Sequence, residues 1–278
     1  MDTTIARRML RTLEPVHGMI YFVPEAAAAY AEVGLEGRAG YFASRAAAMG
    51  PVPAEVVVAT FFNFHPDLVR TQIPDAWDRA TPAQVLDARH RAVDAALRRL
   101  LGDAAHGPEI AEAAELAREA TTALSPVGRP LYAGHASLPW PDEPHLVLWH
   151  AQTLLREHRG DGHVACLVTS GINDGCEALV THAATEAVPA DVLRTSRAWS
   201  IAEWDAAVTR LADRGWVHAD GSFTDVGRRV RDEIEACTDQ LSMAPWRLLG
   251  EERCARLREL VRPLSRAIVD GGGLVPTA

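Results

Sequence analysis

Residues 189–241 read PADVLRTSRAWSIAEWDAAVTRLADRGWVHADGSFTDVGRRVRDEIEACTDQL, and the local signals in this stretch decide the fold class. Ser200 and Glu203 form a capping box that predicts a helix starting at residue 201. Gly215 stands at the left-handed position that ends such a helix, and Asp220-Gly221 predicts the tight turn of a hairpin. A short helix precedes these signals and a long helix follows them. Helix, helix, hairpin and helix in this order are typical of a winged helix-turn-helix unit.

The rest of the chain is dominated by helical periodicity, so we predict a mainly α fold. We expect residues 145–278 to form the winged-helix domain with its flanking helices. Residues 1–144 are expected to form a helical N-terminal domain packed against it, and the pattern leaves open a degenerate second winged-helix unit there. The Pro- and Gly-rich stretch 125–144 marks the boundary, and its large apolar residues indicate an ordered connection.

The chain has 278 residues, of which 48% are hydrophobic, and this is enough for a sizeable core. No apolar run approaches the length of a membrane span, and the first residues lack the apolar core of a signal peptide. The cysteines are widely spaced and form no CxxC pair, so we predict free thiols, no metal site and a cytoplasmic protein. The net charge is −9, and an acidic chain is not the usual footprint of a nucleic-acid binder.

The richest polar stretch is HLVLWHAQTLLREHRGDGH at residues 145–163. Helical spacing places its histidines and carboxylates near one face, while Gly160 and Gly162 predict a break that turns Asp161 and His163 back toward that face. Two imidazoles and two carboxylates can bind a metal such as zinc or iron, although no known ligand spacing is present. A histidine beside a carboxylate can also act as a general base with an arginine that binds an anionic substrate, and the same groups can line an effector pocket. A buried structural network of ion pairs is the other interpretation. The candidate ligand-binding residues in this stretch are His150, Glu157, His158, Arg159, Asp161 and His163.

A second candidate is FFNFHP at residues 61–66. Asn63 and His65 are polar groups among large aromatic residues, and a buried polar group needs a hydrogen-bond partner. They either form a pocket wall opposite the polar stretch, or belong to an aromatic core in which Asn63 caps the following helix. Both interpretations stay open, and Asn63 and His65 remain candidate ligand-binding residues.

Contacts with DNA are harder to predict from the helix-turn-helix stretch. In such a unit the first residues of the second helix face the base edges, and here they include Glu203, Trp204 and Asp205. The two carboxylates repel phosphates, and residues 186–241 carry seven arginines against eleven acidic residues. Arg194, Arg197, Arg228 and Arg229 can nevertheless form a local basic strip, and with Arg210 they are the candidate phosphate contacts.

Several classes of chemistry have no support in the sequence. There is no GxGxxG after a strand, no Walker loop, no GxSxG elbow and no HExxH pair. Nucleotide binding, the α/β-hydrolase mechanism and a zinc-protease site are therefore not predicted. The sequence identifies no cofactor and no reaction, and whether the protein is an enzyme stays open.

LADRGWVHADGSFTDVGRRVRDEIE, residues 211–235, resembles the recognition-helix end, wing and closing helix of MarR-type regulators. Over most of its length the chain is also similar to an actinobacterial family of two-part winged-helix proteins, described as helix-turn-helix or MarR-like, without an established activity. The matching stretches are HGMIYFVPEA (17–26), GRAGYFASRAA (37–47), FFNFHP (61–66), LPWPDEPHLVLWHA (138–151) and LREHRGDGHVA (155–165). The MarR resemblance implies a homodimer that binds DNA and releases it when a small ligand enters. The chain departs from MarR-type regulators in its greater length and its acidic recognition helix.

Two functional hypotheses follow from these observations. The first is a ligand-responsive winged-helix transcriptional regulator of MarR-like type, with DNA and a small-molecule effector as partners. The second is an enzyme or small-molecule-binding protein that reuses the winged-helix fold, with a His/Arg/carboxylate pocket and no DNA binding. The winged-helix order favours the first hypothesis, and the acidic recognition helix favours the second.

Overall fold

The computed structural model describes residues 1–172 and 174–275. Within these residues the protein consists of helices joined by turns and loops, which confirms the prediction of a mainly α fold. The first part of the chain forms α1 (Ile5–Gly18), η1 (Met19–Tyr21), α2 (Pro24–Glu32), α3 (Gly37–Ala46), η2 (Ala47–Met49), α4 (Ala54–Phe61), α5 (Pro66–Arg70), α6 (Asp75–Arg79), α7 (Pro82–Leu101), η3 (Gly102–His106), α8 (Pro108–Thr121) and α9 (Pro130–Ala136). The second part forms α10 (Pro144–Thr169), α11 (Gly175–Ala183), α12 (Ala190–Ser196), α13 (Ile201–Asp213), α14 (Asp225–Leu241) and α15 (Ala244–Asp270). None of the described helices is long and apolar enough to cross a membrane.

Local sequence signals explain where most of these helices begin and end. Prolines occupy the first turn of α7, α8, α9 and α10, where a missing N–H costs no helical hydrogen bond. The predicted capping box of α13 is confirmed, because the Glu203 N–H donates to the Ser200 hydroxyl and the Ser200 N–H donates to the Glu203 carboxylate. The end of this helix is also confirmed, since Gly215 has a φ of 71°.

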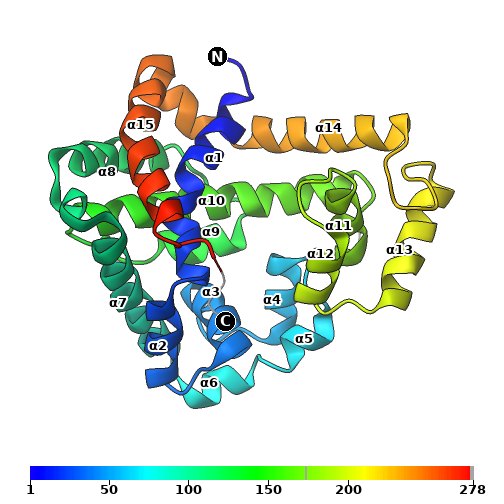
Figure 1. Ribbon diagram of the computed structural model, residues 1–278, viewed down its shortest axis with the longest axis horizontal. Helices are drawn as coiled ribbons and strands as arrows, with labels where there is room; N and C mark the ends of the chain where they lie inside the picture. Colours follow the sequence, from blue (N-terminus) through cyan, green and yellow to red (C-terminus); the bar gives the residue numbers. More distant parts are fainter. Residues whose placement is uncertain (173, 276–278) are drawn as a thin grey trace.

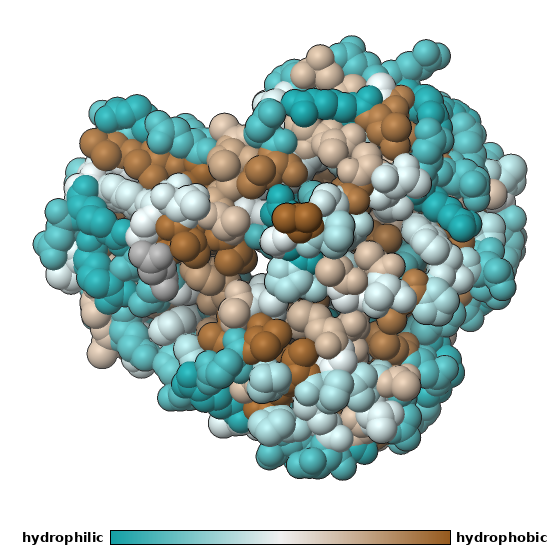
Figure 2. Space-filling model, turned by 180° about the vertical axis from the view of Figure 1, so that it is seen from behind, coloured by the Kyte–Doolittle hydropathy of each residue, from teal (hydrophilic) through white to brown (hydrophobic). Residues whose placement is uncertain are grey.

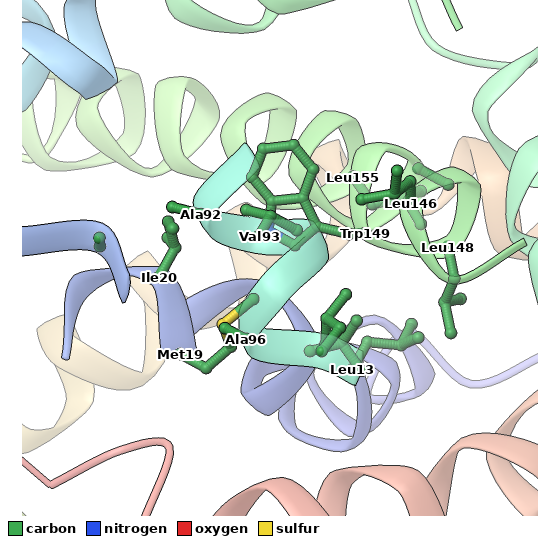
Figure 3. Close-up of a cluster of buried hydrophobic side chains, with 14 of the residues drawn as sticks. Leu13, Met19, Ile20, Ala92, Val93, Ala96, Leu146, Leu148, Trp149 and Leu155 are labelled. Carbon is green, nitrogen blue, oxygen red and sulfur yellow. The ribbon is translucent and has the colours of Figure 1, made fainter. Parts of the chain in front are cut away.

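One large hydrophobic core joins the N-terminal helices with the first half of α10 and with α15. Figure 3 shows part of this core, with Leu13 from α1, Val93 from α7 and Trp149 from α10. The last helix, α15, returns to pack on α1 and α8, so the C-terminal end of the chain completes the core of the N-terminal helices. We call this assembly the N-terminal body. The division of the chain at residue 144 into two domains stays a prediction.

The helices α11, α12 and α13 form the helix-turn-helix unit, which has a small core of its own. Ala207 and Leu211 of α13 belong to this core together with Cys176 and Val180 of α11. α14 closes the unit and runs beside α10 back to the N-terminal body (Figure 1). The unit and the body are therefore connected by two long neighbouring helices.

The predicted two-stranded wing is wrong in its extent. A single antiparallel bridge joins Val217 and Phe223, and no strand forms in the part of the chain that the structure describes. The predicted turn is present, because the His218 N–H donates to the Ser222 carbonyl over 2.8 Å. α14 begins two residues after Phe223, so the second arm of the hairpin is too short for a ladder.

The predicted break at Gly160 and Gly162 is also wrong, because α10 is one continuous helix. Gly162 allows close packing instead: a Cβ at this position would lie 2.1 Å from Nη1 of the buried Arg129. Asp161 does not turn back, and its carboxylate accepts a hydrogen bond from the Tyr132 N–H (3.0 Å) in the first turn of α9. Asp161 thus ties α9 to α10.

The helix-turn-helix unit touches the N-terminal body a second time, at the loop between α4 and α5. We call residues 62–65 of this loop the docking segment, and residues 197–200, between α12 and α13, the HTH turn. The His65 N–H donates to the Arg197 carbonyl (3.0 Å), and Trp199 Nε1 donates to the Asn63 carbonyl (3.0 Å). These bonds hold the residues that directly precede α13, the second helix of the helix-turn-helix motif.

Gly175, at the start of α11, tests how closely the unit is docked. A Cβ at this position would lie 2.2 Å from the Phe62 carbonyl oxygen, so the backbone must shift to accommodate it. We expect Gly175→Ala to lower the free energy of unfolding by about 1–3 kcal/mol, the usual cost of overpacking. Gly160→Ala, on the exposed side of α10, is the control and should stabilise the protein by up to about 1 kcal/mol. Urea unfolding measures both, and equal free energies for the two variants would contradict the close contact.

Candidate functional site

A cleft of about 330 Å³ lies beside α10, lined mainly by residues of the N-terminal body and of α10 and, from the HTH turn, by Arg197. Figure 2 shows that the surface is hollowed between the N-terminal body and the helix-turn-helix unit. Five of the predicted ligand-binding residues line this cleft, namely Asn63, Glu157, Arg159, Asp161 and His163. The first belongs to the docking segment, and the others lie on consecutive turns of α10. The polar stretch and the FFNFHP motif therefore meet, as one of the two interpretations of the sequence expects.

The other three predicted residues lie outside the cleft. His150 lines a separate cavity nearer the start of α10. The buried His158 ring packs edge-on against the Tyr132 ring, with centroids 5.1 Å apart. The His65 side chain faces the helix-turn-helix unit, where its Nε2 lies 2.9 Å from Oε1 of Glu203. The structure does not bring these histidines together with the cleft residues.

Sequence reasoning missed Arg45 and Arg156, which also line the cleft. Arg156 donates from Nε to Glu14 (2.9 Å) and from Nη1 to Glu157 (2.9 Å). Arg45 donates from Nη1 to the Tyr41 hydroxyl (3.0 Å). The only signal for this network was the neighbouring pair Arg156-Glu157, because Arg45 lies far away in the sequence.

Glu157 is the buried centre of this network, with 3% of its surface exposed. Burial raises the pKa of its carboxyl, but the positive charges of Arg156 and Arg45 outweigh burial and hold the pKa below its ordinary value. Glu157 is therefore a carboxylate at neutral pH. A general acid or base needs a pKa near the working pH, so Glu157 is better suited to compensate the buried arginines.

Several buried polar atoms of the cleft residues have no hydrogen-bond partner within residues 1–172 and 174–275. They are Asn63 Oδ1, Arg45 Nε, Arg159 Nε and Arg197 Nε. Buried polar atoms in native proteins nearly always have a partner. Three guanidinium donors and one amide acceptor suit a small ligand that carries a carboxylate or phosphate and at least one N–H or O–H group.

Asp161 differs from Glu157 in its ionisation. Burial raises the pKa of the Asp161 carboxyl to about 6, although the hydrogen bond from the Tyr132 N–H opposes this rise. The nearby charge of Glu157 raises the pKa further. Asp161 is therefore the acid of the cleft whose charge changes within a mild pH range.

The histidines of the polar stretch are neutral at physiological pH. Burial lowers the pKa of His158 and that of His163 to about 4. His163 Nδ1 lies 2.9 Å from Oγ1 of Thr238, which joins α10 to α14. No group of three or more His, Cys, Asp or Glu side chains in the described residues is arranged to hold a metal ion. In the cleft, His163 therefore offers an uncharged ring.

Two of the arginines predicted to contact DNA are already paired within the helix-turn-helix unit. Arg210 donates to Glu177 (2.6 Å) and to Asp174 (2.8 Å), so its charge is compensated. Arg194 donates to Asp191 over 3.1 Å. Neither guanidinium is free to bind a phosphate unless it leaves a carboxylate.

The remaining candidate DNA contacts divide between the cleft and the surface. Arg197 lines the cleft, with its Cζ 5.3 Å from the centroid of the Phe64 ring. Arg228 and Arg229 stand at the start of α14, and both are exposed. Neither makes an ion pair with any residue that the structure describes. Of the five candidates, these two arginines are the exposed ones without an ion pair among the described residues, and their contact with phosphates stays a prediction.

The first turn of α13 is occupied by contacts within the protein. Hydrogen bonds from Ser200, followed by the contact with His65, lower the pKa of Glu203 to about 2. The exposed face of the helix carries Ile201, 64% exposed, and the acidic Asp205. This face lacks the free donors that normally read guanines or phosphates.

The capped helix-turn-helix unit, its closing helix and the body on which it docks define the class of protein. The model of the helix-turn-helix family matches residues 6–276. The chain therefore belongs to this family, which confirms the prediction of a helix-turn-helix protein and indicates a DNA-binding regulator in general. The narrower MarR-like type and the actinobacterial origin stay predictions. No curated protein and no solved structure matches the chain.

Asp161 makes stability depend on pH in a way that one substitution can test. Its pKa is about 6 in the folded protein against an ordinary value of 3.8, so between these values the folded state binds more protons than the unfolded chain. The stabilisation is fully present below the lower value and is lost as the pH rises through the higher one. We expect Asp161→Asn, which keeps an acceptor for the Tyr132 N–H, to match the wild type at about pH 4 and to be more stable at about pH 7. Urea unfolding at both pH values checks this, and a pH-independent difference would contradict the raised pKa.

Proposed function

We propose that the protein is a ligand-responsive helix-turn-helix regulator whose effector is a small anion that binds in the cleft. The supporting observation is that two segments that hold the recognition helix also form walls of the cleft. Asn63 belongs to the docking segment and Arg197 to the HTH turn; both residues line the cleft, and each has a buried polar atom without a partner among the described residues. A ligand that bonds to both residues touches the two sides of the docking contact.

An anion in the cleft would stabilise the docked arrangement. Arg45 belongs to α3 of the N-terminal body and Arg197 to the HTH turn, so an anion between them bridges the two lobes. Docking keeps the first turn of α13 against His65, where it is not free to enter a major groove. A ligand shifts an equilibrium by its differential affinity for the two states, so we expect the effector to lower the affinity for DNA. This direction agrees with the one that the MarR resemblance implies.

The other partners belong to the same proposal. Arg228 and Arg229 would contact the phosphates beside the short wing. A homodimer and a cytoplasmic location are carried over from the resemblance and from the free cysteine thiols. The MarR-like type of regulation is likewise part of the proposal.

A second candidate function is small-molecule binding without DNA. The exposed Asp205 and the half-exposed Glu203 favour it, because a recognition helix with acidic residues in its first turns repels phosphates. In that case the cleft would serve a substrate or ligand, and the helix-turn-helix unit would be a structural lobe. Binding to DNA distinguishes the two candidates.

DNA binding should depend on the two free arginines of α14. We expect the purified protein to bind random-sequence and upstream-region DNA with micromolar or tighter affinity that falls steeply with salt. Replacing Arg228 and Arg229 by alanine should weaken binding to all sequences and reduce the slope of log K against log salt by about 2. Fluorescence anisotropy at two or more salt concentrations measures both quantities.

The matched control replaces Arg262 and Arg266, two exposed arginines of α15, by alanine. This double variant has the same change in net charge and should keep the affinity and the salt slope of the wild type. Equal losses in both double variants would show that only net charge matters. No binding of the wild type at low salt would reject the regulator and leave the second candidate.

Arg197 tests whether the cleft binds anions. We expect phosphate and succinate to raise the melting temperature of the wild type and to weaken its binding to DNA, because the anion compensates buried guanidinium groups. Arg197→Gln should lose most of both effects. Arg194→Gln, in the last turn of α12 directly before the HTH turn but paired with Asp191, should retain them. Thermal unfolding and anisotropy provide the measurements, and identical responses of the two variants would contradict an anion site at Arg197.

A further inference from the structure

A second cavity lies beside α7, α9 and the first turns of α10, and it shares no lining residue with the cleft. Its volume is about 380 Å³, within the range of pockets that bury small organic ligands. Most of its wall is apolar or aromatic, and Leu86, Leu138, Trp140 and Trp149 contribute to it. Trp140 is half-buried and lies at the edge of the cavity, with its ring centroid 4.7 Å from that of His150.

Arg89 places a buried positive charge in this wall. The residue is 1% exposed, and Nη1 donates to the Ser44 carbonyl (2.7 Å), while Nε and Nη2 have no partner within residues 1–172 and 174–275. Among the described residues, no carboxylate oxygen lies within 4 Å of the Arg89 guanidinium, so Arg89 forms no ion pair. Asp87, which lines the same cavity, pairs with Arg91 instead. Two aromatic rings lie beside the Arg89 guanidinium: its Cζ is 5.3 Å from the centroid of the Trp149 ring and 5.8 Å from that of the Tyr21 ring.

A buried guanidinium without a counter-charge is costly, and an anion that binds to it removes the cost. Two more unsatisfied groups lie in the same wall, Trp149 Nε1 and His150 Nε2. The indole nitrogen can only donate, and burial lowers the pKa of His150 to about 4, so its ring is neutral and can donate from one nitrogen. The cavity therefore combines an apolar wall with several nitrogen atoms that have no hydrogen-bond partner among the described residues.

We propose that this cavity is a second ligand site, which binds a small aromatic carboxylate. The carboxylate pairs with Arg89 and accepts from Trp149 Nε1 and His150, and the ring of the ligand packs against the apolar wall at Trp140 and Leu138. Arginine suits a carboxylate because its planar donors match the two oxygens. The proposal does not rest on DNA binding or on occupancy of the cleft.

The acidic group of the ligand is the feature to test, because the apolar wall alone would accept neutral rings. We expect benzoate, naphthoate or indoleacetate to bind the wild type at least about tenfold more tightly than the corresponding neutral carboxamide, since a charge-assisted hydrogen bond is lost in the amide. Isothermal titration calorimetry with each acid and its amide measures the ratio. Arg89→Met, of similar volume and without charge, should reduce the ratio to about one.

Two further variants locate the site and guard against misfolding. Trp140→Ala removes a half-buried side chain at the edge of the cavity, and it should weaken binding of the acid by several fold while the circular dichroism spectrum is kept. Arg197→Gln, in the cleft, should leave the affinity for the aromatic acid unchanged, whereas it removes the response to phosphate and succinate. If Arg89→Met does not fold, the proposal is tested by two other measurements: the ratio of acid to amide affinity in the wild type, and the loss of acid affinity in Trp140→Ala. Absence of binding by all three acids at millimolar concentration, equal affinities of acid and amide, or a loss confined to Arg197→Gln would each overturn the proposal.

Discussion

The contact between the docking segment and the HTH turn is the constraint on which the rest of the structure depends. The Asn63 carbonyl accepts from Trp199, and Trp199 directly precedes Ser200, the N-cap of α13, so the bond fixes the starting point of that helix. The docking segment adopts an unusual backbone to make this contact, since Phe62 has a φ of 54°, a conformation that costs roughly 1–3 kcal/mol in a residue other than glycine. Without this contact the helix-turn-helix unit would be attached mainly along α10 and α14 and through the hydrogen bond from Arg38 to the Ser196 carbonyl, and the cleft would lose the wall that Asn63 and Arg197 form.

The cleft and the second cavity share a physical feature, which is a buried arginine that is not fully satisfied. In the cleft, the Glu157 carboxylate compensates the charges of Arg156 and Arg45. Several guanidinium nitrogens of the cleft arginines still have no hydrogen-bond acceptor among the described residues. In the second cavity Arg89 has no carboxylate partner among the residues that the structure describes. A protein that buries such charges is under strain until an anion arrives, because a desolvated cation gains more from a counter-ion than an exposed one does. We therefore propose anions for both sites, with a ligand that is otherwise polar in the cleft and aromatic in the cavity.

The sequence predicts the features of this structure that depend on nearby residues, and it fails where distant residues decide. The capping box of Ser200 and Glu203 and the end of α13 at Gly215 are local, and both are confirmed. Gly162 looks like a helix break because its reason, the Arg129 side chain packed against it, comes from more than thirty positions away. His150 and Glu157 share a helix face as predicted, but seven residues of helix separate them by about 10 Å, so each lines a different cavity. Arg45 and Arg89 could not be assigned at all, since only the packing of α3 and α7 around α10 reveals what they face.

α10 connects every part of this arrangement. Trp149 and His150 line the second cavity, Glu157 and Asp161 line the cleft, and Leu167 packs in the helix-turn-helix lobe, all on one helix without a break. A continuous helix transmits a shift or rotation along its length more readily than two helices joined by a flexible turn. If a ligand in either site moves α10 relative to the docking segment, the other site and the orientation of α13 respond to the same displacement. Thermodynamic linkage requires that this effect be reciprocal. A ligand that favours docking must bind more tightly to the docked protein than to the undocked one, and the ratio of the two affinities equals the factor by which the bound ligand shifts the docking equilibrium.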